Sequence, residues 1–178
     1  IQDQDGWVWV GTSNAGILRF RNDNGAYIGS VGGLGSDSVI SMAYDEYTET
    51  LVVGHPENGV SLVNTSTISL IGTYDTGDGL DSDLVVDVAT RYGIAYLATP
   101  DSGLMRIDLA GLQILSSWQS LGADSLEAAP VAIDGDTVYF GLPGFGVMIL
   151  DRINGDIVDL LTVGNSGLPD NDVLSLYT

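Results

Sequence analysis

The sequence contains no cysteine and no lysine, and it has a single histidine, His55. The missing cysteine excludes disulfide bonds, thiolate metal centres and cysteine nucleophiles. The missing lysine excludes Schiff-base chemistry and a P-loop, whose mechanism needs a lysine on the phosphates. A single imidazole also excludes a metal centre built from several histidines. Carboxylate, amide and hydroxyl oxygens therefore remain as the main candidate ligands.

Positive charge is scarce as well, because five arginines face 24 acidic residues and the formal net charge is −19. Such a surface repels phosphate backbones and anionic lipid surfaces, so we expect no nucleic-acid partner. No apolar run approaches the roughly 20 residues that span a bilayer, so we expect no membrane insertion. Yet 44% of the residues are hydrophobic, which excludes a disordered acidic tail and fits one folded domain of 178 residues.

The composition also bears on the compartment. The sequence opens at Ile1 without methionine or signal peptide, as expected for a mature product or an excised segment. Abundant aspartate, glycine, serine and threonine without lysine are typical of secreted or salt-exposed proteins. We therefore predict an extracellular or cell-surface location, the alternative being that the acidity merely maintains solubility.

One pattern recurs four times: a short apolar strand, a loop, and a glycine that opens a second apolar strand. This glycine recurs in steps of 43, 44 and 43 residues, at Gly16, Gly59, Gly103 and Gly146. A second marker pairs a leucine with Val or Leu five residues later, at Leu34/Val39, Leu80/Val85, Leu121/Leu126 and Leu168/Val173. The sequence around it predicts a further strand per repeat, at Val39–Met42, Val85–Val88, Pro130–Ile133 and Val173–Leu176. The closing strands are predicted at Ala26–Val31, Ser69–Tyr74, Leu112–Trp118 and Ile157–Val163.

Four antiparallel strands in about 44 residues are typical of a propeller blade. We therefore predict an all-β propeller, a single domain over residues 1–178 with four blades of four strands. Its repeats are approximately 169–178 joined to 1–36, then 37–80, 81–124 and 125–168. In this interpretation the C-terminal strand completes the N-terminal blade and removes both sheet edges. The alternative is a four-repeat excerpt of a larger propeller.

Residues Gly167–Leu176, Asp5–Thr12 and Gly16–Phe20 together resemble the two-component-regulator propeller repeat. That pattern runs Gly-Leu-Pro, a polar pair and Val, then Asp-x-x-Gly, an aromatic strand, Gly-Thr and a strand led by Gly. Parts of it recur at Gly33–Val39 and Gly79–Val85. The resemblance implies a β-propeller, commonly seven-bladed and often the extracellular ligand-sensing part of a signalling protein. Similar repeats also occur in secreted surface proteins as scaffolds.

In propellers the loops after the second and fourth strands share one face around the axis. The candidates for a ligand on this face are Asn14, His55, Glu57, Asp101 and Phe145. The fourth-strand loops carry oxygen side chains at matching positions, namely Asp37, Asp83, Asp124 and Asn171. A ring of such oxygens could bind Ca²⁺ or a polar ligand. The alternative is structural, because Asx residues before strands commonly bond nearby backbone N–H groups.

The densest acidic loop is Asp75–Asp83, whose carboxylates Asp75, Asp78, Asp81 and Asp83 repel one another unless solvated or bridged by a cation. It is a weak calcium candidate, since it does not match an EF-hand, and a solvated loop is the alternative. Otherwise no cofactor is expected.

Four aligned residues, Trp9, Val52, Tyr96 and Tyr139, are expected to pack between neighbouring blades. Trp7 and Trp118 fit the period less well and could be exposed, where aromatic contact with carbohydrate is conceivable. Phe145, between two glycines in a loop, is a candidate anchor for a protein partner.

No nucleophile or paired carboxylate can be placed from the sequence, so we predict that the chain is not an enzyme. The favoured hypothesis is a non-catalytic extracellular propeller acting as a rigid interaction or scaffold module, with protein partners or self-association. The alternatives are a ligand-sensing domain of a two-component signalling protein, binding a carbohydrate or small ligand, and, less favoured, a glycan-active enzyme.

Overall fold

The computed structural model describes residues 1–100, 102–115, 117 and 130–178. These residues form strands and turns, and none of them lies in a helix that is long and apolar enough to cross a membrane. In chain order the strands are β1 (Trp7–Gly11), β2 (Ile17–Arg21), β3 (Tyr27–Val31), β4 (Ser41–Asp45), β5 (Thr50–Gly54), β6 (Val60–Asn64), β7 (Ser69–Tyr74), β8 (Asp87–Arg91), β9 (Ile94–Thr99), β10 (Gly103–Asp108), β11 (Gln113–Ile114), β12 (Val131–Asp134), β13 (Thr137–Leu142), β14 (Gly146–Asp151) and β15 (Ile157–Leu161).

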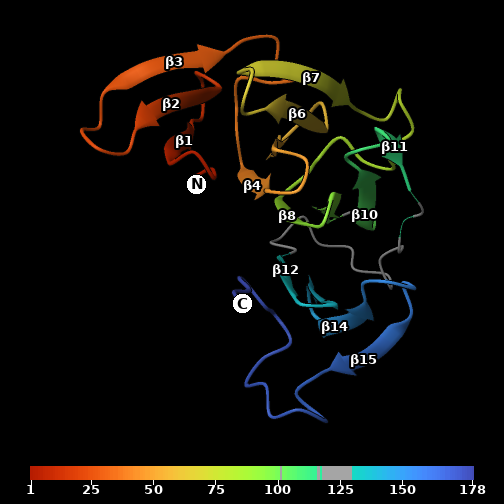
Figure 1. Cartoon of the computed structure of the whole chain (residues 1–178). Coiled ribbons are helices and arrows are strands. Elements are labelled where there is room, and N and C mark those ends of the chain that lie inside the picture. Colours follow the sequence, from red (N-terminus) through yellow and green to blue (C-terminus); the bar gives the residue numbers. More distant parts are fainter. Residues whose placement is uncertain (101, 116, 118–129) are drawn as a thin grey trace.

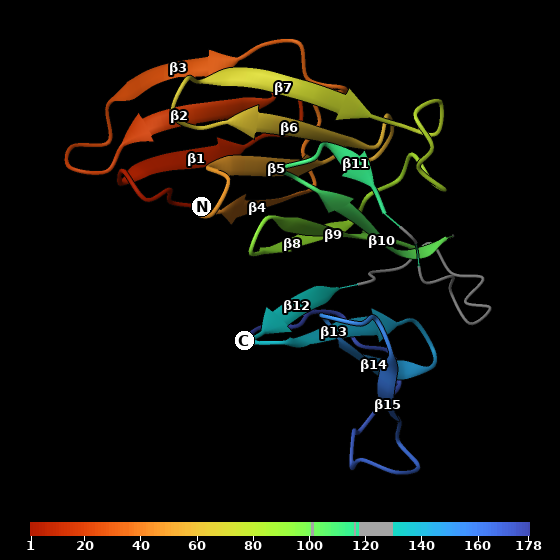
Figure 2. The same cartoon turned by 45° about the vertical axis from the view of Figure 1, so that its right-hand side comes forward.

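The strands pair in sequence order into four antiparallel sheets: β1–β3, β4–β7, β8–β11 and β12–β15. We call these blades 1 to 4. They follow one another along an open arc, with β4, β8 and β12 toward the middle and β3, β7, β11 and β15 outside (Figures 1 and 2). This arrangement confirms the predicted all-β propeller class and its four blades.

Aspartate or asparagine ends four of the strands that lead into hairpins, namely Asp45, Asn64, Asp108 and Asp151. In each case a side-chain oxygen accepts hydrogen bonds from backbone N–H groups of the turn that follows. The short polar side chain thus satisfies donors that the ladder cannot reach. Three of the acidic residues, Asp45, Asp108 and Asp151, therefore serve to form turns.

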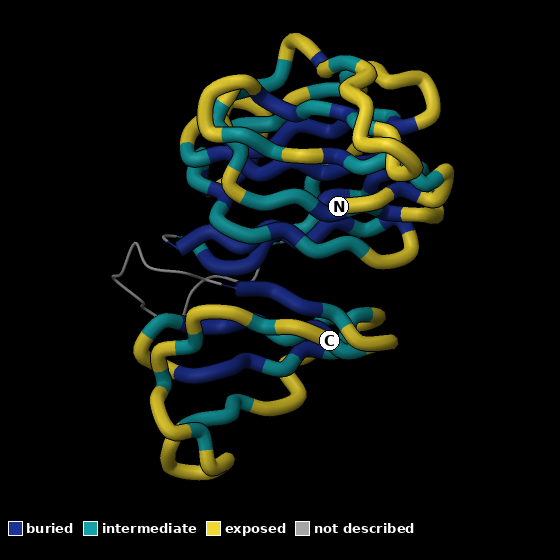
Figure 3. Tube along the Cα trace, turned by 90° about the vertical axis from the view of Figure 1, so that its left-hand side faces the viewer, coloured by how far each residue is buried: buried dark blue, intermediate teal, exposed yellow. Residues whose placement is uncertain are grey.

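The core lies between consecutive blades, in three clusters of buried side chains. Figure 3 shows these buried segments running along the stacked sheets. Successive side chains of a strand point to opposite faces of its sheet. In β5, Leu51 and Val53 therefore pack toward blade 1, and Val52 packs toward blade 3. Trp9, Val52 and Tyr96 are completely buried in this way, which confirms their predicted packing between blades.

The inner strands of blades 2 and 3 begin two residues later than predicted, at Ser41 and Asp87. The residues before them belong to the linkers between blades. The backbone N–H of Val39 donates to the carbonyl of Thr12 at 2.8 Å, and Val85 donates to His55 in the same way at 3.0 Å. These bonds tie each linker to the preceding blade, so that the strand of the next blade starts only after them.

The predicted closure of the ring is not formed. Blade 1 has three strands, and its inner position holds only Ile1 and Gln2, which pair with Trp9 and Val8. The predicted strand Val173–Leu176 is wrong, because residues 171–178 form no ladder. Instead this segment lies beside blade 4, where the Thr178 hydroxyl donates to the carbonyl of Ile133 at 2.9 Å. Four stacked blades span only part of a circle, so the two ends stay apart.

Candidate functional site

Three of the recurring glycines bind the linker that follows their own blade through a backbone hydrogen bond. The backbone N–H of Gly16, Gly59 and Gly146 donates to the carbonyl oxygen of Asp37, Asp83 and Asn171 at 2.8, 2.9 and 3.0 Å. The oxygen side chains predicted as a ring therefore sit in linkers whose backbone is already engaged. Asn171 also accepts the Val163 N–H with its side chain. These contacts favour the structural alternative for the matching Asx positions over a ligand ring; Asp124 lies outside the described residues.

His55 is completely buried rather than presented on the loop face. Its Nδ1 lies 2.8 Å from the Ser38 carbonyl, and its Nε2 lies 2.8 Å from the Ser61 hydroxyl, which accepts the Gly35 N–H. A carbonyl oxygen can only accept a hydrogen bond, so we assign the proton of the neutral His55 ring to Nδ1. The Ser61 hydroxyl then donates its hydrogen bond to Nε2. The prediction of His55 as a ligand-face residue is thus wrong: the ring ties the linker after β3 to β6.

Burial lowers the pKa of His55, and the Ser38 carbonyl opposes this only in part. Because the pKa in the folded state lies below that of the unfolded chain, the unfolded state binds more protons below pH 6.5. Stability contributed by neutral His55 is complete above that pH and falls as the pH decreases. We expect a loss of at most about 1.4 kcal/mol between pH 7.5 and 5.5.

Chemical unfolding at both pH values should show this loss in the wild type relative to His55→Gln. The difference between the two proteins is the readout, because the carboxylates titrate alike in both. An equal pH response of the two proteins would contradict the assignment of a neutral, buried ring.

The other ligand-face candidates stay separate. Asn14 and Glu57 are exposed in corresponding loops of blades 1 and 2, and Phe145 is 40% exposed in the β13–β14 loop of blade 4. Asp101 lies outside the described residues. Of the predicted set, Phe145 alone offers a large apolar surface.

The acidic loop is held by its own turn. Asp75 Oδ1 accepts the Gly77 N–H at 2.6 Å, Asp83 Oδ1 accepts the Thr76 N–H at 2.7 Å, and Asp81 accepts the Ser117 hydroxyl at 2.8 Å. Asp78 Oδ2 lies 3.3 Å from the Asp75 N–H. Over the described part of the chain, no three carboxylate or imidazole groups gather as metal ligands. The loop chemistry fits turn formation, and calcium binding stays a prediction.

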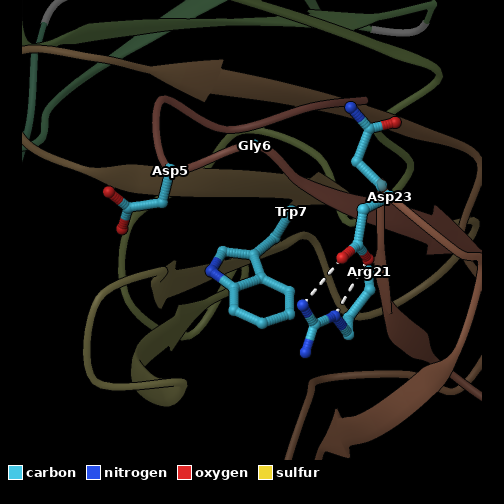
Figure 4. Close-up of a pocket in the computed structure, with 6 residues that line it drawn as sticks. Asp5, Gly6, Trp7, Arg21 and Asp23 are labelled. Carbon is cyan, nitrogen blue, oxygen red and sulfur yellow. Dashed lines mark hydrogen bonds and ion pairs between the residues drawn. The ribbon is translucent and has the colours of Figure 1, made fainter.

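A shallow, exposed pocket of about 340 Å³ lies where β1 begins and β2 ends (Figure 4). Arg21 forms a bidentate ion pair with Asp23 there, at 2.9 and 2.8 Å. The hydrogen bond from Arg21 lowers the pKa of the Asp23 carboxyl. Trp7 lines the pocket. The Arg19 guanidinium stacks on the Trp7 indole, and its Cζ atom lies 4.0 Å from the centroid of that ring. Trp7 is half-buried, and the pocket offers a polar ligand one indole, the Asp5 carboxylate and one ion pair.

Asp87 holds the inner strands of three blades together, although the sequence analysis placed it only within a strand. Its Oδ1 accepts the Ser41 hydroxyl of β4 at 2.7 Å, and its Oδ2 accepts the Val131 N–H of β12 at 2.9 Å. A pocket of about 500 Å³ opens beside these inner strands and the C-terminal segment. The aspartate is thus engaged structurally, as acceptor for its neighbours. An acidic residue in a strand that faces the axis is the signal that could have revealed it.

No family model and no curated protein matches the chain. Among solved structures it is similar to the computationally designed Ika8 protein, with a TM-score of 0.77 and 17% identity over 99% of this chain and 51% of that one. The β-propeller domain of Cps50 (Swd1) from Myceliophteria thermophila gives 0.72 and 13%, over 89% and 52%. The extracellular domain of BT3049 from B. thetaiotaomicron, named as a hybrid two component system, gives 0.67 and 17%, over 97% and 25%.

At these identities the comparisons show the fold alone. The chain spans about half of the designed protein and of the Cps50 domain, and a quarter of the BT3049 domain. The resemblance seen in the sequence is thus supported at the level of the propeller fold, which a domain named for a two-component system shares. These relationships identify the chain as a β-propeller module.

Proposed function

We propose that this chain is a non-catalytic extracellular β-propeller that serves as a rigid scaffold for protein interactions. The observation that carries the proposal is that side chains capable of acid–base chemistry are engaged in structural hydrogen bonds. The single imidazole is buried in a hydrogen-bond relay, and Asp83 and Asp87 accept bonds from linker and strand groups. Side chains that already hold loops and blades through hydrogen bonds are poorly placed to act on a substrate. The exposed surface instead offers loops and isolated apolar side chains.

Two observations support the extracellular location. The chain has no cysteine or lysine and a net charge of −19, a composition typical of salt-exposed proteins. Two similar folds are extracellular domains from B. thetaiotaomicron. Protease added to intact source cells should therefore degrade the protein while a cytoplasmic marker survives. Full protection until the cells are lysed would refute this location.

Phe145 is the residue most suited to anchor a partner, because it is an exposed aromatic between two glycines on the loop face. The immobilised chain should retain a discrete protein from a surface-protein extract. Phe145→Ala should weaken the dissociation constant of that purified protein at least tenfold, as for an anchor worth about 2 kcal/mol. The control is Ile153→Ala, at a 71% exposed turn position of the same blade. Equal weakening by both variants, or by neither, would remove Phe145 from the proposal.

The pocket at Trp7 favours a second candidate function, a sensor domain that binds a polar ligand such as a carbohydrate. An indole beside carboxylates and an ion pair combines a stacking surface with hydrogen-bonding groups. Titration with a panel of defined oligosaccharides should then quench Trp fluorescence in the wild type but not in Trp7→Phe. Unchanged fluorescence throughout the panel would leave the scaffold function as the better account.

A further inference from the structure

A pocket of about 420 Å³ lies between two hairpin turns, one joining β4 to β5 in blade 2 and one joining β8 to β9 in blade 3. Glu46 and Tyr47 line it from the first hairpin, and Arg91 and Tyr92 line it from the second. Figure 2 shows the two turns side by side at the same end of the stacked sheets. We call this hollow the tyrosine pocket, because both tyrosine rings are largely exposed in it.

The two turns that form the tyrosine pocket are fixed to each other. Asp45 Oδ1 accepts the Thr48 N–H at 2.9 Å within the first turn, and Asp45 Oδ2 accepts the Gly93 N–H of the second turn at 2.9 Å. Asp45 is buried, and the Tyr47 ring lies against Gly93. The walls of the pocket are therefore held in place before a ligand arrives, which reduces the entropy lost on binding.

The two rings of the pocket differ in what lies over them. Arg91 and Arg152 both stack on Tyr92, with their Cζ atoms 4.7 and 5.0 Å from the ring centroid, and Arg152 reaches this ring from blade 4. Tyr47 is 75% exposed, and within the described residues no guanidinium lies over its ring. Tyr47 thus offers a guanidinium the kind of surface that Tyr92 already provides to two arginines of the chain.

The charge around Tyr47 is negative. Over the described residues the ion pairs are those of Asp23 and Asp136, so the Glu46 carboxylate has none. Glu49 lies in the same turn as Glu46 and Tyr47, and one guanidinium, that of Arg91, opposes these carboxylates in the pocket. The net charge of −19 adds a long-range attraction for cations and repels anions. The pocket therefore favours a positively charged group that can also stack on a ring.

We propose that the tyrosine pocket binds an arginine side chain of a basic protein partner, whose guanidinium stacks on Tyr47 and pairs with the Glu46 carboxylate. A guanidinium is planar, weakly hydrated and rich in N–H donors, so one group can stack on a ring and bind a carboxylate at once. A lysine ammonium is a compact, strongly hydrated charge and lacks the plane. The inference rests on the proposed scaffold function and names the chemistry of one partner.

Calorimetric titration of the full chain with two peptides of equal charge, acetylated hexa-arginine amide and hexa-lysine amide, tests the proposal. At about 0.15 M NaCl, where charges are screened beyond about 8 Å, the hexa-arginine peptide should bind at least about threefold more tightly than the hexa-lysine peptide. Tyr47→Ala should weaken hexa-arginine binding about fivefold and abolish the preference for arginine, whereas Tyr47→Phe keeps a ring and should stay within about twofold of the wild type. The control is Tyr27→Ala, at a 58% exposed position on β3 of blade 1, which should leave both affinities unchanged.

The carboxylate is tested by a second pair of variants with the same change in charge. Glu46→Gln should weaken hexa-arginine binding about threefold, as expected for a partly exposed ion pair. Glu57→Gln removes one charge from the exposed loop between β5 and β6, at the other end of blade 2, and should change the affinity less than about twofold. Equal effects of the two substitutions would mean that the peptide responds only to the net charge, which would overturn the proposed pairing.

The proposal would also be overturned if the wild type bound neither peptide, bound both equally well, or lost no more affinity through Tyr47→Ala than through Tyr27→Ala. None of these outcomes bears on the surface location or on Phe145, which lies in a β13–β14 loop outside this pocket. A partner that depends on Phe145, together with unchanged peptide binding by Tyr47→Ala, would refute this inference alone. Failure of the inference is thus distinguishable from failure of the proposed function.

Discussion

Replacing Gly59 with alanine should lower the free energy of unfolding by about 3–4 kcal/mol and the melting temperature by roughly 8–14 °C. Gly59 has φ of +64°, in the left-handed region that costs an L-residue about 1–2 kcal/mol. A Cβ there would also overlap the backbone carbonyl of Tyr74. That oxygen belongs to β7, which pairs with β6 at this point, so relief of the clash must displace the ladder.

Gly25→Ala separates the two contributions. Gly25 has nearly the same φ, +67°, but a Cβ there meets nothing within 4 Å. This control should cost only the conformational term, about 1–2 kcal/mol. Denaturant unfolding of both variants measures the difference. If Gly59→Ala cost no more than Gly25→Ala, the close approach of β6 and β7 would not be the reason for glycine at the repeat marker.

The spacing of this glycine could be predicted from the sequence because the same position recurs once in every repeat. The turn after the second strand places this glycine at a positive φ in all four blades, and in three of them its N–H is seen to donate to the following linker, so the repeat keeps one glycine at one place. Alignment of the repeats likewise identified Trp9, Val52 and Tyr96 as packing between blades, whereas Tyr139, predicted in the same way, is only partly buried.

The features that the sequence did not predict depend on contacts distant along the chain. His55 looked like a loop residue, and only the return of Ser38 and Ser61 to its two ring nitrogens buries it. The C-terminal repeat pattern predicted a strand at Val173–Leu176, but a strand requires a partner edge, and four blades leave that edge across the opening of the arc. Repeat spacing gives the number of blades and carries no information on the angle between them.

Asp87 was partly predictable from the sequence and partly not, and its replacement should have the second large effect on stability. Its strand was predicted, but its role arises from Ser41 and Val131, which are 46 and 44 residues away. Nothing local distinguishes it from the aspartates that shape turns. The adjacent blades bring one hydroxyl and one backbone N–H to its two oxygens, so a single carboxylate connects blades 2, 3 and 4 near the axis.

Asp87→Ala should therefore destabilise the protein by about 2–3 kcal/mol, because the buried Val131 N–H loses its acceptor and the Ser41 hydroxyl loses a charged one. Asp87→Asn should fall between wild type and alanine, since the amide keeps one acceptor oxygen but places an NH₂ group near a donor. The control is Glu57→Ala, which removes the same charge from an exposed loop and should stay within about 0.5 kcal/mol of the wild type. Denaturant unfolding ranks the three variants, and amide hydrogen exchange at Val131 should accelerate in Asp87→Ala before global unfolding. Equal stability of Asp87→Ala and Glu57→Ala would mean that the inner strands hold together through packing alone.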